Sequence, residues 1–191
     1  NRQHDCDMLL DQNYVDGYEI RYLGLVPNDC QVYLGPRYAL LREEFYQYRN
    51  LQRKRDGVVR RILVSFGGSD PTDETLRLLR VLSQIKKHTV SDISIDIIAG
   101  ASNRSSNVIS AFCNELKDTA FYSSVSNIAE FMYNSDVAIG AGGMTTWERC
   151  FLGLPAMVIV TADNQLESSK AVNKYGAIKL IGRSEILSER L

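Results

Sequence analysis

The sequence predicts a doubly wound, Rossmann-like α/β fold with a parallel sheet, and two observations carry the prediction. From residue 58 onward, short apolar runs alternate about six times with segments of helical periodicity, and the connections between them are short. The apolar runs contain few polar residues, which is typical of parallel strands that are covered by helices on both faces.

Six strands, each followed by a helix, are expected in this regular part of the chain. The expected strands are 61–66, 93–98, 119–122, 136–139, 156–160 and 177–181. The expected helices are about 72–87, 107–116, 127–133, a segment ending at 151, 164–175 and a last one from 185 onward. The first helix shows the pattern clearly, because Leu76, Leu79, Leu82 and Ile85 form one apolar stripe.

Residues 1–57 are less regular and predict only fragments of a domain. Short strands are expected at 7–10 and 31–34, and a helix at about 38–48. The chain opens on Asn1 rather than Met and runs almost directly into the first strand, so we expect further sequence to precede it. We therefore predict that 1–57 is the remnant of an amino-terminal domain and an inter-domain segment, in front of a ligand-binding domain at 58–191.

Composition and charge exclude several classes of function. The 191 residues are 45% apolar and 24% charged, with a net charge of −1, so we expect a globular protein that does not bind nucleic acid. No apolar stretch is long enough for membrane insertion, and a cytoplasmic location is expected. The basic run 49–61 is interpreted as a solvated linker and helix end rather than a binding patch.

The cysteines and histidines do not form a metal-binding pattern. The four cysteines are far apart in the sequence, without a C-x-x-C pair, and there are only two histidines. We therefore expect reduced thiols, with Cys150 in the core, and neither a metal nor a cofactor.

Three strand-to-helix turns carry small, polar or amide-rich sequence, at 66–71, 140–146 and 162–165. In an open parallel sheet such turns lie along the carboxyl ends of the strands, which is where ligands bind. Backbone N–H groups at helix starts suit an anionic group such as a phosphate. The sequence therefore predicts a nucleotide site at this edge of the sheet.

The first turn has the sequence Gly67-Gly68-Ser69-Asp70-Pro71. Local chemistry alone explains its end, with Asp70 as a helix N-cap and Pro71 at the first helical position. It does not explain the two glycines and the serine, which let a ligand approach the main chain and offer a hydroxyl to a phosphate. We favour phosphate contact.

The second turn, 140–148, is glycine-rich but is not a dinucleotide fingerprint, because the third glycine is absent. Thr145 and Glu148 match a T-x-x-E capping box. Alternatively, Gly142, Gly143 and the threonine hydroxyls meet a pyrophosphate, and Glu148 accepts hydrogen bonds from two ribose hydroxyls. The spacing fits both interpretations equally.

The third turn brings adjacent amides to the end of a strand, in the sequence Asp163-Asn164-Gln165. Asn164 with Glu167 again fits a helix cap. Adjacent amides also bind sugar hydroxyls, since each offers donors and an acceptor.

Several stretches of the chain together resemble one enzyme family. They are 4–10, 24–27 with Cys30, 38–46, 66–71, 127–132, 145–148, 153–155 and 164–165. The family is that of the UDP-sugar hydrolases of pseudaminic acid biosynthesis, which act on UDP-2,4-diacetamido-2,4,6-trideoxy-altropyranose. These enzymes are built like the GT-B glycosyltransferase that makes lipid II. The block 38–46 is specific to the hydrolases, whereas the glycine turns are shared across GT-B proteins.

The resemblance implies that this chain is the carboxyl-terminal half of a GT-B fold, which holds UDP or a UDP-sugar as its partner. It implies candidate substrate-binding residues at Gly67, Gly68, Ser69, Asp70, Tyr122, Ser123, Gly142, Gly143, Thr145, Thr146, Glu148, Asn164 and Gln165. The two glycine turns would lie at the phosphates, Glu148 at the ribose and the main chain of 122–123 at the uracil. Asn164, the candidate catalytic residue, and Gln165 would contact the sugar.

The implied reaction is displacement of UDP by water at the anomeric carbon, with inversion and without a metal. The general base of the family is a histidine in a G-x-G-H turn, and this sequence contains no such turn. His4 matches a later motif of the family. We therefore expect that an amino-terminal domain in cis is missing, and that this chain alone binds UDP weakly and hydrolyses nothing measurable.

Two other functions fit the same residues. One is the donor-binding half of a GT-B transferase, which passes the sugar to an acceptor. The other is a non-catalytic module that binds nucleotide sugars.

Overall fold

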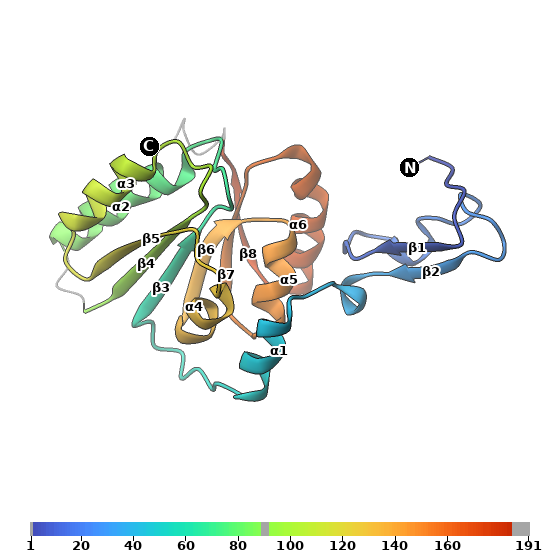
Figure 1. Cartoon of the computed structure of the whole chain (residues 1–191), viewed down its shortest axis with the longest axis horizontal. Coiled ribbons are helices and arrows are strands. Elements are labelled where there is room, and N and C mark those ends of the chain that lie inside the picture. Colours follow the sequence, from blue (N-terminus) through green and yellow to red (C-terminus); the bar gives the residue numbers. More distant parts are fainter. Residues whose placement is uncertain (1, 89–91, 185–191) are drawn as a thin grey trace.

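The computed structural model describes residues 2–88 and 92–184. Its main body is a parallel sheet with the strand order β5-β4-β3-β6-β7-β8, flanked by helices (Figure 1). Numbered from β3, this is the order 3-2-1-4-5-6 of a doubly wound sheet, in which the chain builds outward first to one side and then to the other. The predicted fold class is confirmed.

The elements of the main body lie within two residues of their predicted positions. The strands are β3 (Arg61–Ser65), β4 (Ser94–Ala99), β5 (Thr119–Ser123), β6 (Val137–Ala141), β7 (Ala156–Val160) and β8 (Lys179–Arg183). The helices are α2 (Glu74–His88), α3 (Ser106–Asn114), α4 (Ile128–Asn134), α5 (Met144–Phe151) and α6 (Asp163–Tyr175). The helix expected from residue 185 onward lies outside the described residues.

Successive side chains of the central strands pack into two separate apolar cores. Leu63 of β3 packs with Met132 of α4 and Val172 of α6. Its neighbour Val64 points to the other face, where it packs with Leu79 of α2 and residues of α3. Helices α2 and α3 therefore cover one face of the sheet, and α4, α5 and α6 cover the other (Figure 1).

The described part of the chain begins with a segment that we call the arm, residues 2–38, which precedes α1 (Glu43–Asn50) and β3. Its strands β1 (Met8–Asp11) and β2 (Gln31–Leu34) pair in parallel as a separate two-stranded sheet. Two 3-10 turns, η1 (Tyr18–Ile20) and η2 (Pro36–Tyr38), complete it. The arm projects from the main body beside α6 (Figure 1), where Asp16 pairs with Lys174 at 3.2 Å.

The helix predicted at 38–48 begins later than expected. The structure has α1 at Glu43–Asn50, with extended backbone at Arg42 before it. The backbone is also extended at Ala39, directly after η2, and the amide of Leu40 donates to Gln12 Oε1 of the arm at 3.1 Å. Phe45 of α1 is fully buried in the core that α4 and α5 share with the sheet.

The prediction that the basic run 49–61 is a solvated linker is wrong for two of its arginines. Arg55 donates to the carbonyl oxygens of Met132 and Ser135 at the end of α4, and of Leu152 and Gly153 at the end of α5, at 3.0–3.2 Å. Arg53 forms an ion pair with Asp136 at 2.5 Å. Cations that bind the free carbonyls of helix ends are stabilising, so this run anchors α1 to the sheet.

Candidate functional site

The carboxyl ends of β3 and β6 meet where the strand order of the sheet reverses. The two strands are paired, with Ser65 opposite Gly140, so the turns at 67–69 and 142–143 leave the sheet from neighbouring strands. This switch point is where doubly wound sheets bind ligands. The third predicted turn, at 162–165, follows β7, which pairs with β6. All three turns lie along the same edge.

The turn after β3 exposes main chain. Gly67, Gly68 and Ser69 are exposed, and Gly67 has a φ of 89°, which favours glycine. Gly68 packs closely against the end of β4, because a Cβ at Gly100 would lie 2.4 Å from the Gly68 Cα. The Ser102 hydroxyl also donates to the Gly68 carbonyl at 3.0 Å. The end of β4 therefore fixes the shape of this turn.

Asp70 directs its carboxylate into the protein. It is 4% exposed, and its two oxygens accept from the amides of Glu74 and Thr75 at 3.0 and 2.9 Å. Asp70 thus caps α2, as local chemistry predicts, but Pro71 is not at the first helical position. Positive φ angles at Asp70 and Asp73 delay the helix until residue 74. Asp70 holds the turn in place through the helix that it caps.

The two glycines after β6 have different environments. Gly143 is the N-cap of α5, has a φ of 95° and has no atom within 4 Å of the place where a Cβ would be. Gly142 is buried, and a Cβ there would lie 2.8 Å from Ser169 Oγ and 3.2 Å from Gln165 Cβ of α6. Gly142 therefore lets the turn pack on α6, while Gly143 leaves main chain open to a ligand.

The predicted T-x-x-E capping box is wrong. Thr145 lies inside α5, which begins at Met144 and has no side-chain cap. Thr145 is half-buried and Thr146 is buried, where its hydroxyl lies 3.4 Å from the Arg149 guanidinium. The Glu148 carboxylate is therefore not used as a helix cap.

Glu148 instead forms an ion pair with the segment before α1. Its side chain is 12% exposed, and its Oε1 lies 3.5 Å from a guanidinium nitrogen of Arg42. Arg42 also pairs with Glu44 at 2.8 Å. Burial raises the pKa of the Glu148 carboxyl above its ordinary value, and Arg42 opposes that shift. The site thus holds a partly desolvated carboxylate with one arginine beside it.

Two arginines of this region, Arg42 and Arg149, were missed by the sequence analysis. Arg42 reaches Glu148 from 106 positions away in the chain, a contact that no sequence spacing reveals. Arg149 is 3% exposed and lies behind the turn after β6. The sequence did offer one signal for the burial of Arg149. It lies three residues after Thr146 and therefore on the same face of α5, which is buried.

The third turn presents one exposed amide and one engaged amide. Asn164 is exposed in the first turn of α6, and the predicted cap that it would form with Glu167 is absent, since no side chain caps α6. Gln165 Oε1 accepts from the amide and the hydroxyl of Thr161, at 3.1 and 3.3 Å. Of the two side-chain amides in this turn, that of Asn164 is the exposed one.

Tyr122 and Ser123 end β5, the outermost strand on one side of the sheet. Ser123 is exposed, and the Tyr122 ring packs edge-on against Phe131 of α4, with the ring centroids 4.7 Å apart. These two residues lie at the same carboxyl edge as the glycine turns, two strands away from β3.

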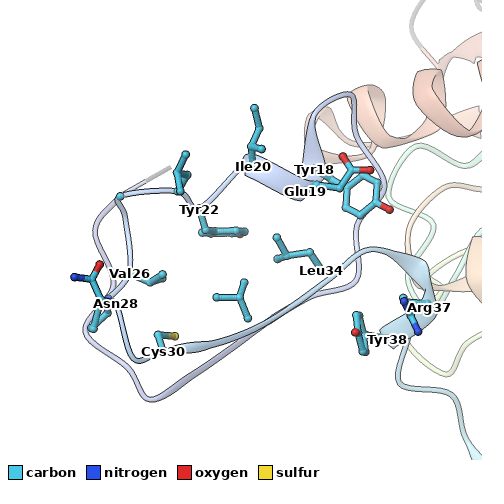
Figure 2. Close-up of a pocket in the computed structure, with 14 residues that line it drawn as sticks. Tyr18, Glu19, Ile20, Tyr22, Val26, Asn28, Cys30, Leu34, Arg37 and Tyr38 are labelled. Atoms are coloured by element: carbon cyan, nitrogen blue, oxygen red, sulfur yellow. The ribbon is translucent and has the colours of Figure 1, made fainter.

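The arm carries a hollow of about 540 Å³. Figure 2 shows side chains of Tyr22, Val26 and Leu34 directed into the space between η1 and β2. A second hollow, of about 410 Å³, lies between the arm and α5–α6 and is lined by Tyr14, Trp147 and Cys150, among others. Cys150 was predicted in the core and is only partly buried.

Cys6 and Cys30, far apart in sequence, lie with their sulfur atoms 3.8 Å apart as free thiols.

No group of three or more histidine, cysteine or acidic side chains within 2–88 and 92–184 is arranged to hold a metal ion. None of the helices in these ranges has the length and apolarity needed to cross a membrane.

The strand order and the glycine turns at the switch point define a Rossmann-like domain of the kind that forms the carboxyl-terminal half of GT-B glycosyltransferases. Comparison with known families identifies it further. Residues 62–191 match the glycosyltransferase family 28 C-terminal domain, and the chain belongs to this family.

Three curated proteins are similar in sequence. An uncharacterised protein of Methanocaldococcus jannaschii, MJ1062, is 31% identical over 73% of this chain and 29% of its own length. The spore coat polysaccharide biosynthesis protein SpsG of Bacillus subtilis is 25% identical over 90% of this chain and 50% of its own length. The UDP-2,4-diacetamido-2,4,6-trideoxy-beta-L-altropyranose hydrolase of Campylobacter jejuni is 29% identical over 92% of this chain and 60% of its own length. The chain thus spans between 29% and 60% of these relatives.

Among solved structures, MurG of Acinetobacter baumannii superposes with a TM-score of 0.59 and 17% sequence identity. The likeness covers 95% of this chain and 56% of MurG. At this level of identity, it describes the fold alone.

Proposed function

We propose that the switch point between β3 and β6 binds the UDP moiety of a UDP-linked sugar. The observation that carries the proposal is the meeting of two open glycine turns at neighbouring strand ends, with the carboxylate of Glu148 one turn into the helix that follows. Exposed main chain at the N-terminus of α5 suits a diphosphate. A carboxylate without a capping role suits the two hydroxyls of a ribose.

The other candidate residues take the following roles in this proposal. Gly67, Gly68 and Ser69 contact the pyrophosphate from the β3 side, opposite Gly143 and Thr145. The main chain of 122–123 recognises the uracil at the same edge of the sheet. The exposed amide of Asn164 contacts the sugar, and Gln165 supports the turn through Thr161.

The reaction that we propose is hydrolysis, in which water displaces UDP from the anomeric carbon with inversion. The similarity to the Campylobacter jejuni hydrolase, over 92% of this chain, supports this choice, as does the 38–46 block. A pathway that builds pseudaminic acid or a related surface glycan is the corresponding setting. In this proposal an amino-terminal domain in cis supplies the general base, and the 191-residue chain alone has no measurable turnover.

Sugar transfer is the second candidate reaction, since the matching family model describes a glycosyltransferase domain. A donor half looks the same for hydrolysis and for transfer. The product decides between them, because hydrolysis releases the free sugar and transfer yields a glycoside. If the polypeptide that carries this domain binds a UDP-sugar and forms neither product, a non-catalytic binding module is the remaining function.

The test of the binding proposal is a calorimetric titration of the chain with UDP, repeated with Glu148→Ala. Loss of the ribose hydrogen bonds to a partly buried carboxylate is expected to weaken binding by about 1.5–3 kcal/mol. Glu115→Ala is the matched control, because Glu115 is an exposed glutamate at the end of α3. An unchanged affinity in Glu148→Ala, or no UDP binding by the wild-type chain, contradicts the proposal.

A further inference from the structure

Arg149 carries a charge in the interior of the protein, and no carboxylate is hydrogen-bonded to it within the described residues. Its side chain belongs to α5 and is 3% exposed. One guanidinium nitrogen donates to the carbonyl of Ala141 at 2.7 Å and lies 3.4 Å from the Thr146 hydroxyl. Its Nε has no hydrogen-bond partner, and within the described parts of the chain it forms no ion pair with a carboxylate.

The guanidinium lies directly behind the switch-point turn. A Cβ at Gly140 would lie 3.1 Å from its Nη1, so the group contacts the backbone of the last two residues of β6. These residues run straight into Gly142 and Gly143, and Thr146 follows in the first turn of α5. Arg149 thus contacts the chain on both sides of the open main chain at Gly143.

An unpaired buried cation is unusual on energetic grounds. Removing an ion from water costs several kcal/mol unless an opposite charge compensates it. Burial lowers the pKa of the Arg149 guanidinium to about 10, which still leaves it charged at neutral pH. The adjacent Glu148 carboxylate pairs with Arg42 instead. The N-terminus of α5 adds its partial positive charge at the same turn.

We propose that Arg149 makes the switch point selective for a nucleoside diphosphate over a nucleoside monophosphate or a free nucleoside. This inference rests on the proposed UDP site. The bound diphosphate adds an opposite charge on the other side of the turn from the guanidinium, and the two groups attract each other across the backbone of that turn. Arg149 acts as a positioning residue, since it holds the Ala141 carbonyl and contributes its charge without lining the exposed surface.

The test compares the affinities of UDP, UMP and uridine for the wild-type chain and for Arg149→Met, Arg149→Gln and Arg149→Lys. In the two neutral variants the UDP affinity is expected to fall by about tenfold or more, whereas uridine binding changes less than about twofold. UMP is expected to lie between them. Arg149→Lys keeps the charge and is expected to retain most of the preference for UDP. Arg80→Met, at an exposed arginine on α2, is the matched control.

The outcomes separate the inference about Arg149 from the proposed UDP site. Equal losses for UDP and uridine in the neutral variants assign Arg149 a purely structural role and overturn the inference. The same holds if neither neutral variant folds in thermal unfolding experiments. A wild-type chain that binds UDP no more tightly than uridine overturns the inference and leaves the nucleotide site standing. A wild-type chain that binds no UDP removes both.

Discussion

At the scale of the residue, Glu148 shows how burial and one neighbour set the properties of a candidate ligand group. Its carboxylate is 12% exposed, and the charged groups that face it are Arg42 and Glu44 from the α1 side and Arg149 on its own helix. Burial and Glu44 raise its pKa, while the two arginines oppose the shift, and the net result is a pKa above the ordinary value. The carboxyl therefore takes up a proton at a higher pH than a solvated glutamate.

A pH dependence of nucleoside binding follows from this shift. Ribose hydroxyls donate to the ionised carboxylate, so binding is complete above the pKa of Glu148 and is lost as the pH falls through it. Because the pKa is raised, the loss is expected to begin at a higher pH than the ordinary glutamate value of about 4.3 implies. Uridine is the appropriate ligand, since its uncharged ribose does not titrate in this range.

The measurement is a titration of the chain with uridine, followed by NMR, at a series of pH values. Glu148→Gln is the control and is expected to bind uridine more weakly with little dependence on pH. The same acid-side loss in Glu148→Gln as in the wild type would assign the titration to another group.

At the scale of the element, the segment between α1 and β3 is held by its arginines. Arg55 donates to carbonyls at the ends of two helices, and Asp136 binds the segment through Arg53 and the amides of Arg60 and Arg61. These bonds tie α1 to the sheet without a single apolar residue between 52 and 57.

Replacing Arg55 with alanine is expected to lower the free energy of unfolding by about 2–3 kcal/mol, because four carbonyl groups at the ends of α4 and α5 lose a charged donor. Chemical denaturation monitored by circular dichroism measures the change. Lys54→Ala, at the exposed neighbouring position, is expected to change stability by less than about 0.5 kcal/mol. Equal effects of the two substitutions would mean that the bonds of Arg55 contribute nothing.

Prediction from sequence succeeded for the elements whose structure is determined locally. The strands and helices of the main body follow from apolar periodicity and turn chemistry, and the glycine turns from their place after β3 and β6. The segment before the helix start at 43 makes two contacts with distant residues: the amide of Leu40 donates to Gln12, and the guanidinium of Arg42 pairs with Glu148. Such contacts join distant parts of the chain, so no local pattern predicts them.

At the scale of the whole molecule, the arm contacts the main body through Tyr14 and Asp16, which meet Tyr175 and Lys174 of α6, whereas α1 packs into its core. Phe45 is fully buried in the core formed by α4, α5 and the sheet, although it precedes β3 by 16 residues. The residues needed for a stable main body therefore include α1.

Two truncations test where the stable unit begins. A chain of 39–191 retains α1 and is expected to unfold cooperatively, with a stability near that of the full chain. A chain of 58–191 lacks Phe45 and is expected to be less stable by at least about 3–5 kcal/mol, the usual loss for a buried aromatic side chain. Thermal unfolding of both chains gives the comparison, and equal melting temperatures would show that α1 is dispensable.

The short spacing between Arg42 and Phe45 has one more consequence. A single stretch of backbone places one side chain in the core and another against Glu148, with only two residues between them. Each residue in a helix turns the chain by about 100°, so an insertion or deletion there would rotate one of these side chains away from its partner. This stretch should therefore tolerate changes of residue type far better than changes of length.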